Sequence, residues 1–146
     1  MKLRGVGLGL RWEFLDEIVL RLDEGPLPVD FFEVSPENYI GRGGRYPAAL
    51  EKVAERYAIL THGLTMSLGG VDPLDGAYLR ELGAFLREVR TPWHSDHLCF
   101  GAVGGRVLHD LLPVSFKEAH VARIRETASA ALAGSDDDAA LPEVRE

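Results

Sequence analysis

The sequence predicts an α/β fold in which parallel strands alternate with helices. Short apolar runs and amphipathic segments alternate four times, at intervals of about 30 residues, the length of a strand–helix–strand unit. Such a repeat requires crossover helices that pack on at least one face of a parallel sheet. The chain has 146 residues, which suits one domain with a sizeable core.

The first unit begins within residues 3–10, where glycines alternate with apolar residues and predict a buried strand. This stretch is not a dinucleotide-binding fingerprint, because Leu10 stands where GxGxxG requires its third glycine. Residues 12–23 place apolar side chains at helical spacing and predict a helix. Gly25 and Pro26 end that helix.

The second and third units follow the same order. We expect a strand over residues 29–35, a helix over 46–57 and a strand over 58–62. Asp72 and Pro73 predict the start of the third helix, as an N-cap followed by proline at the first helical position.

The fourth strand is expected over residues 92–100 and contains two histidines. Alternate residues of a strand point to opposite faces, so His94 and Asp96 share one face while Ser95 and His97 share the other. The two histidines therefore cannot both face one site, and the strand pattern alone leaves open which of them is structural. A glycine-containing loop and a helix over residues 116–132 complete the unit.

Two architectures fit four such units: an open doubly wound sheet, or the first half of a TIM-type (β/α)8 barrel. The open sheet lacks its usual glycine-rich phosphate loop after the first strand. A complete barrel needs about 250 residues and builds its sites at the carboxyl ends of its strands. The half barrel is the better account, because polar residues follow the predicted strands there: Arg11, Glu37, Asn38, His62 and His97.

Composition narrows the function classes. Residues 1–134 are predicted to form the barrel half, and residues 135–146 an acidic, disordered tail that carries much of the net charge of −7. The rest is only mildly acidic, which argues against nucleic acid as a partner.

Cys99 is the single cysteine, which excludes an internal disulfide and fits a reducing compartment. No apolar run is long enough to span a membrane and no signal peptide is evident, so we expect a cytoplasmic protein.

Several motifs, taken together, resemble those of one family. They are Gly7-Leu8-Gly9-Leu10-Arg11, Phe32-Glu33-Val34-Ser35-Pro36-Glu37-Asn38-Tyr39, Thr61-His62-Gly63-Leu64 with Ser67-Leu68-Gly69-Gly70, Ser95-Asp96-His97-Leu98-Cys99-Phe100, and His109-Asp110-Leu111-Leu112-Pro113. In order and spacing they resemble the multinuclear non-heme iron-dependent oxidative enzymes, also known as UPF0276-type proteins. The resemblance covers roughly residues 3–130.

The resemblance implies a barrel whose mouth holds two or three iron ions, bound by histidine, aspartate, glutamate and asparagine. Such enzymes use O₂ to oxidise cysteine-containing ribosomal peptides, usually with a partner protein that presents the precursor peptide. It assigns His62 and His97 as metal ligands, so that His97 faces the site and His94 does not. Glu37 and Asn38 match a pocket-lining segment.

The remaining candidates for the pocket have weaker support. They are Arg11, Glu33, Asp96, His109 and Asp110. Glu33 lies in mid-strand, and if buried it would need a partner cation or a metal. His109 and Asp110 fit either a helix-start cap or hydrogen-bonded pair, or a wall of the pocket.

The sequence departs from the family in one respect. The family's other ligands lie in the second half of the barrel, and two histidines alone make a poor iron site. We therefore expect a truncated or split form with an incomplete metal site, completed by self-association or by a complementary half-barrel chain. The alternatives are a non-catalytic fragment, or an interaction module that pairs with another chain through its open sheet edges. By fold alone, a barrel of the sugar-phosphate isomerase kind also fits.

Overall fold

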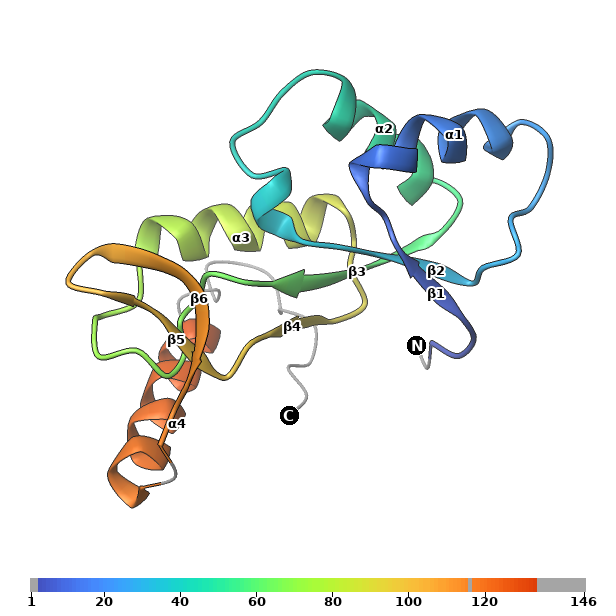
Figure 1. Ribbon diagram of the computed structural model, residues 1–146. Coiled ribbons are helices and arrows are strands. Elements are labelled where there is room, and N and C mark those ends of the chain that lie inside the picture. Colours follow the sequence, from blue (N-terminus) through green and yellow to red (C-terminus); the bar gives the residue numbers. More distant parts are fainter. Residues whose placement is uncertain (1–2, 116, 134–146) are drawn as a thin grey trace.

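A computed structural model describes residues 3–115 and 117–133. Its centre is a parallel four-stranded sheet in the order β1-β2-β3-β4 (Figure 1). The strands are β1 (Gly7–Gly9), β2 (Phe31–Val34), β3 (Ala58–Gly63) and β4 (His94–Asp96). The predicted alternation of helices with parallel strands is confirmed.

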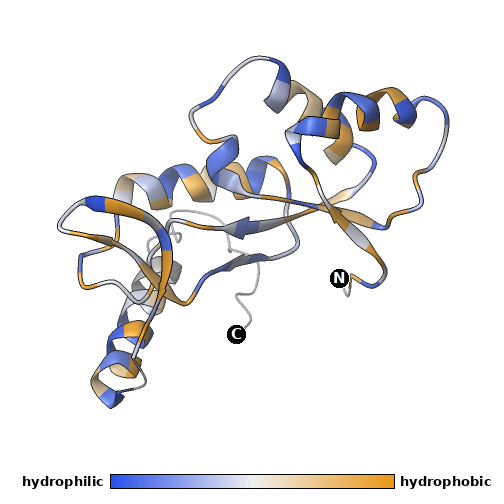
Figure 2. Cartoon of the chain, in the orientation of Figure 1, coloured by the Kyte–Doolittle hydropathy of each residue, from blue (hydrophilic) through white to orange (hydrophobic). Residues whose placement is uncertain are grey.

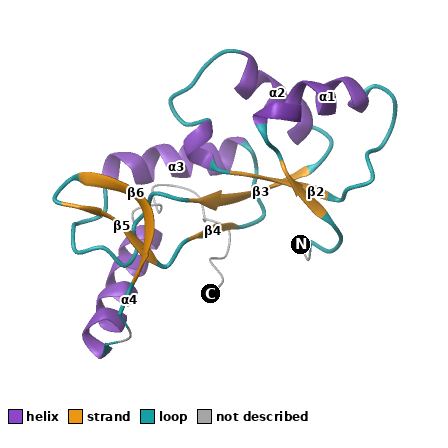
Figure 3. Cartoon of the chain, viewed as in Figure 1, coloured by secondary structure: helices purple, strands orange, loops and turns teal. Residues whose placement is uncertain are grey.

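Three helices lie on one side of this sheet (Figure 3). They are α1 (Trp12–Leu22), α2 (Arg45–Ala54) and α3 (Gly76–Glu88), and a short 3-10 helix, η1 (Pro36–Asn38), follows β2. The predicted bounds of α1 and α2 are correct to within a few residues. Each helix has an apolar stripe, and that stripe determines which side packs on the sheet.

The core lies between the three helices and the sheet. Phe32 of β2 and Ile59 of β3 are register partners, and both are almost fully buried beneath Leu15 of α1 and Val53 of α2. Figure 2 shows hydrophobic residues along β2, hydrophilic residues in β4, and a mixture of the two on the helices, as expected for helices with one solvent-facing side. The opposite face of the sheet has no helix of α1–α3 on it.

The fourth strand is shorter than predicted. Residues 92–100 do not form one strand, because β4 ends at Asp96. There the Asp96 Oδ1 atom accepts a hydrogen bond from the His97 amide at 2.7 Å, and the Cys99 amide donates to the His97 carbonyl at 2.9 Å. These local bonds turn the chain away from the sheet.

An antiparallel hairpin follows in place of the predicted loop. Its strands are β5 (Cys99–Val103) and β6 (Arg106–Pro113). Gly104 and Gly105 have φ of 60° and 73° at its tip, the left-handed conformation that a tight two-residue hairpin turn requires. Cys99 is buried at its base, and burial raises the pKa of its thiol, which stays protonated at neutral pH.

The start of α3 differs from prediction, whereas α4 (Glu118–Ala133) lies within a few residues of its predicted bounds. Helix α3 begins after Asp75, whose side chain accepts hydrogen bonds from the Ala77 and Tyr78 amides, so Asp72 is not its cap. Helix α4 begins well after Asp110, which lies in β6. Of the alternatives for His109 and Asp110, the helix-start cap is therefore wrong, while the hydrogen-bonded pair and the pocket wall stay predictions.

No helix in the described part of the chain is long and apolar enough to cross a membrane. The predicted acidic tail, residues 135–146, lies outside the described residues.

Candidate functional site

Two histidines meet at the carboxyl ends of β3 and β4. His62 lies near the end of β3, and His97 follows β4 directly. Their Nε2 atoms are 2.9 Å apart, and the rings lie edge to face with an interplanar angle of 70°. Both side chains are half-buried, so they can be reached from solvent.

The second nitrogen of His62 contacts a serine. His62 and Ser95 are register partners on neighbouring parallel strands, and the His62 Nδ1 atom lies 2.8 Å from the Ser95 Oγ atom. Both ring nitrogens of His62 are therefore engaged, which fixes the plane of the ring. The strand alternation that places Ser95 and His97 on one face could have identified Ser95 from the sequence.

His94 lies on the opposite face of β4, inside the core. Its Nδ1 atom is 3.0 Å from the Thr61 Oγ1 atom, and its side chain is only 6% exposed. Burial lowers the pKa of His94 to about 4, and the nearby His62 lowers it further while Glu37 opposes the shift. His94 is therefore neutral at physiological pH.

Asp96 lies beside His94 and is also shielded from water. Burial raises the pKa of Asp96 to about 7, and the negative charge of Glu37 adds to this shift. Its Oδ2 atom is buried and has no hydrogen-bond partner among the described residues. Gly63 makes room for this side chain, because a Cβ atom on Gly63 would lie 2.2 Å from Asp96 Oδ2.

Glu37 lies in η1 and contacts the segment that follows β3. Its Oε1 atom accepts hydrogen bonds from the Leu64 amide at 2.7 Å and from the Tyr78 hydroxyl at 2.8 Å. Its Oε2 atom is buried without a partner in the described chain. Tyr78 was not predicted to belong to the site, since only its place in the apolar stripe of α3 is visible in the sequence.

The other predicted residues do not join these groups. Arg11, before α1, is exposed, as are Asn38 in η1 and Asp110 in β6. Glu33 is exposed rather than buried, because it points from β2 toward the sheet face that helices α1–α3 leave uncovered. His109 lies in β6, and its side chain is outside the described residues.

The Nε2 atoms of His62 and His97 lie at hydrogen-bonding distance, and the same spacing is also compatible with two neighbouring ligands of a metal ion. Two ligands in neighbouring positions on an octahedral ion, with bonds near 2.1 Å, lie about 3 Å apart. The Nε2 separation of 2.9 Å in the His62–His97 pair is close to this value. Among the described residues, however, no group of three or more histidine, cysteine, aspartate or glutamate side chains is placed to hold a metal ion.

Comparison with known proteins identifies the family. Residues 5–133 match the RiPP precursor modification enzymes MbnB/TglH/ChrH. The chain belongs to this family. The predicted family resemblance is thus confirmed.

Curated relatives of this family member carry the UPF0276 name. A UPF0276 protein of Acinetobacter baylyi is 41% identical over 125 residues, which are 86% of this chain and 42% of the relative. A UPF0276 protein of Shewanella oneidensis is 40% identical, over 84% of this chain and 44% of the relative. One of Anaeromyxobacter sp. is 41% identical, over 80% of this chain and 40% of the relative. The chain spans less than half the length of these relatives.

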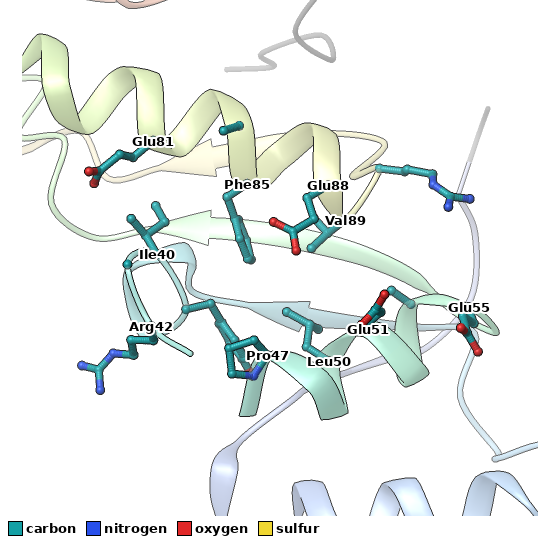
Figure 4. Close-up of a pocket in the computed structure, with 15 residues that line it drawn as sticks. Ile40, Arg42, Pro47, Leu50, Glu51, Glu55, Glu81, Phe85, Glu88 and Val89 are labelled. Atoms are coloured by element: carbon teal, nitrogen blue, oxygen red, sulfur yellow. The ribbon is translucent and has the colours of Figure 1, made fainter. Parts of the chain in front are cut away.

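This family member also has a cleft between α2 and α3, with a volume of about 630 Å³ (Figure 4). Its floor includes the apolar side chains of Leu50, Phe85 and Val89. Its rim carries the carboxylates of Glu51, Glu55, Glu81 and Glu88. None of the predicted site residues lines the cleft, which is therefore separate from the histidine pair.

Proposed function

We propose that this chain contributes His62 and His97 to an iron site in an enzyme that uses O₂ to oxidise cysteine-containing ribosomal peptides. Membership of a family that modifies RiPP precursors supports a peptide substrate. Bound iron would supply the redox chemistry. The chain's own residues would hold the ion and orient its ligands.

One observation carries this proposal. The Nε2 atoms of His62 and His97 come within 2.9 Å of each other. They do so at the carboxyl ends of parallel strands, where α/β folds build their sites. The Ser95 hydroxyl holds the far side of the His62 ring, as outer partners of metal-binding histidines commonly do.

The four strands correspond in this proposal to the first half of a (β/α)8 barrel. Within the described residues, β1 and β4 each pair on one side only. Because iron sites of this type need at least three protein ligands, we propose that a second copy or a complementary chain supplies the others. From the family resemblance we further propose that the complete site holds two or three iron ions and that a partner protein presents the peptide.

A non-catalytic interaction module is the second candidate. It is favoured by the same unpaired edges of β1 and β4, which offer backbone groups to another chain. In that case His62 and Ser95 only join β3 to β4.

Iron content per chain tests the proposal. Protein purified anaerobically with ferrous iron is compared with the His62→Ala/His97→Ala double variant and with His120→Ala, an exposed histidine of α4. We expect near-stoichiometric iron in the wild type and in His120→Ala, and none in the double variant. Absence of iron from the wild type would overturn a site completed by a second copy of this chain, and would leave a complementary chain or the interaction module.

A further inference from the structure

A single oxygen atom of Glu37 collects four hydrogen bonds. The Oε1 atom accepts from the Leu64 amide at 2.7 Å, from the Thr65 amide and hydroxyl at 3.2 Å each, and from the Tyr78 hydroxyl at 2.8 Å. A carboxylate accepts hydrogen bonds more strongly than a neutral oxygen does. Glu37 is therefore the central acceptor of this region, and it comes from a different β/α unit than its donors.

Three of these four donors belong to the segment immediately after His62. Leu64 is two residues beyond His62, where β3 has already ended at Gly63. Leu64 and Thr65 are both exposed, so burial of their own side chains does little to fix the backbone here. The Glu37 carboxylate supplies the acceptor that the sheet no longer provides.

The fourth donor connects this segment to a helix. Tyr78 lies in the first turn of α3, and its ring is half-buried. Burial raises the pKa of Tyr78, and the charges of Glu37 and Asp96 add to the shift, so its hydroxyl remains a donor at all physiological pH values. Glu37 thus joins η1, the segment after β3, and α3 at one point.

We propose that Glu37 is a positioning residue for His62. By fixing the Leu64 and Thr65 amides it holds the end of β3, so that the His62 ring stays between Ser95 and His97. A role of Glu37 in catalysis rests on the proposed iron site. The hydrogen bonds of Glu37 to the Leu64 and Thr65 amides are a property of the metal-free chain, and their effect can be measured in that chain.

Hydrogen exchange and histidine NMR on the metal-free protein test this proposal. In Glu37→Ala we expect the Leu64 and Thr65 amides to exchange at least about tenfold faster, and the His62 ring resonances to shift or split. Glu37→Gln retains a carbonyl acceptor in the same place and should restore most of both signals. The core amides of Val53 and Leu86 report that the fold is intact.

Two further variants keep the test decisive. Glu37→Asp retains the charge but withdraws the oxygen by one methylene group, so it should reproduce the Glu37→Ala result even if the alanine variant does not fold. Glu24→Ala, at an exposed glutamate beyond α1, is the matched control and should change neither signal. Two results would overturn the proposal. One is that the Leu64 and Thr65 amides of Glu37→Asp exchange at the wild-type rate. The other is that these amides exchange faster while the His62 ring resonances stay where they are in the wild type. Neither result depends on iron binding, so this proposal and the iron site can fail separately.

Discussion

His62 Nε2 lies 2.9 Å from His97 Nε2, although the two residues are 35 positions apart in the sequence. Parallel pairing of β3 with β4 brings them together, because it aligns His62 with Ser95 and leaves His97 just beyond the strand end. The relationship therefore depends on sheet register, and a shift of one residue would separate the two rings.

Removing the Ser95 hydroxyl should loosen the His62 ring. In Ser95→Ala the His62 Nδ1 atom loses its partner at 2.8 Å, and we expect affinity for ferrous iron to fall about tenfold, as for other outer partners of metal-binding histidines. An anaerobic binding titration measures this. Ser115→Ala is the matched control, because Ser115 contacts the exposed His120 at 2.6 Å, away from the site. Equal affinities in all three proteins would show that Ser95 has no such role.

Acid should destabilise the fold through His94. Its pKa falls from 6.5 to about 4 on folding, so the unfolded chain takes up a proton that the folded chain excludes. Above pH 6.5 this difference leaves the free energy of unfolding unchanged. As the pH falls toward 4 it lowers the free energy of unfolding, by about 2 kcal/mol between pH 7 and pH 5. Asp96, whose pKa is raised to about 7, acts in the opposite direction over this range.

Comparison with His94→Gln isolates the histidine from the other charges, since Glu37, His62 and Asp96 are present in both proteins. Urea unfolding at pH 7 and pH 5 should show that the variant loses less stability on acidification than the wild type, or gains some. Parallel changes in the two proteins would mean that His94 is not held neutral by the fold.

Substitution of Gly63 should be costly. A Cβ atom there would lie 2.2 Å from Asp96 Oδ2 and 3.1 Å from His94 Cε1, so one of these side chains must move. We expect Gly63→Ala to lower the free energy of unfolding by about 1–3 kcal/mol. Gly9→Ala is the control, because nothing lies within 4 Å of its Cβ position, and it should change stability by less than about 0.5 kcal/mol. A Gly63→Ala variant as stable as Gly9→Ala would contradict the packing described around Asp96.

Two aspartates before α3 distinguish the observed cap from the predicted one. Asp75 accepts hydrogen bonds from the Ala77 and Tyr78 amides, so Asp75→Ala should cost about 1 kcal/mol in urea unfolding. Asp72→Ala should cost less, because within the part of the chain that the structure describes the Asp72 side chain accepts only from the exposed Gly105 amide at 3.2 Å. The reverse order would place the helix start where the sequence alone predicted it.

The regular elements are the part of the fold that the sequence predicts well. Helices α1 and α2 have apolar stripes at helical spacing, and the strand–helix repeat requires parallel pairing. The hairpin was missed, although Gly104-Gly105 between apolar runs is a hairpin signal. The sequence pattern does not predict that β4 ends at Asp96. The strand ends there because the Asp96 side chain, and not a neighbouring strand, accepts the hydrogen bond of the His97 amide.

The candidate site was predictable only in part. Strand alternation separates His97 from His94, and the family motifs point to His62. The contact of Glu37 with Leu64 spans 27 positions and depends on how η1 lies against the end of β3. No local pattern encodes that arrangement. Likewise, the sequence left open whether Glu33 is buried, and its exposure follows from a sheet face that helices α1–α3 do not cover.

The most direct test of the histidine pair is an anaerobic titration of the metal-free chain with ferrous iron, followed by imidazole NMR. We predict that the His62 and His97 ring resonances broaden together with the first ion added, while those of the exposed His120 remain sharp. Broadening confined to His109 or His120, or no specific broadening at all, would contradict the assignment of His62 and His97 as metal ligands.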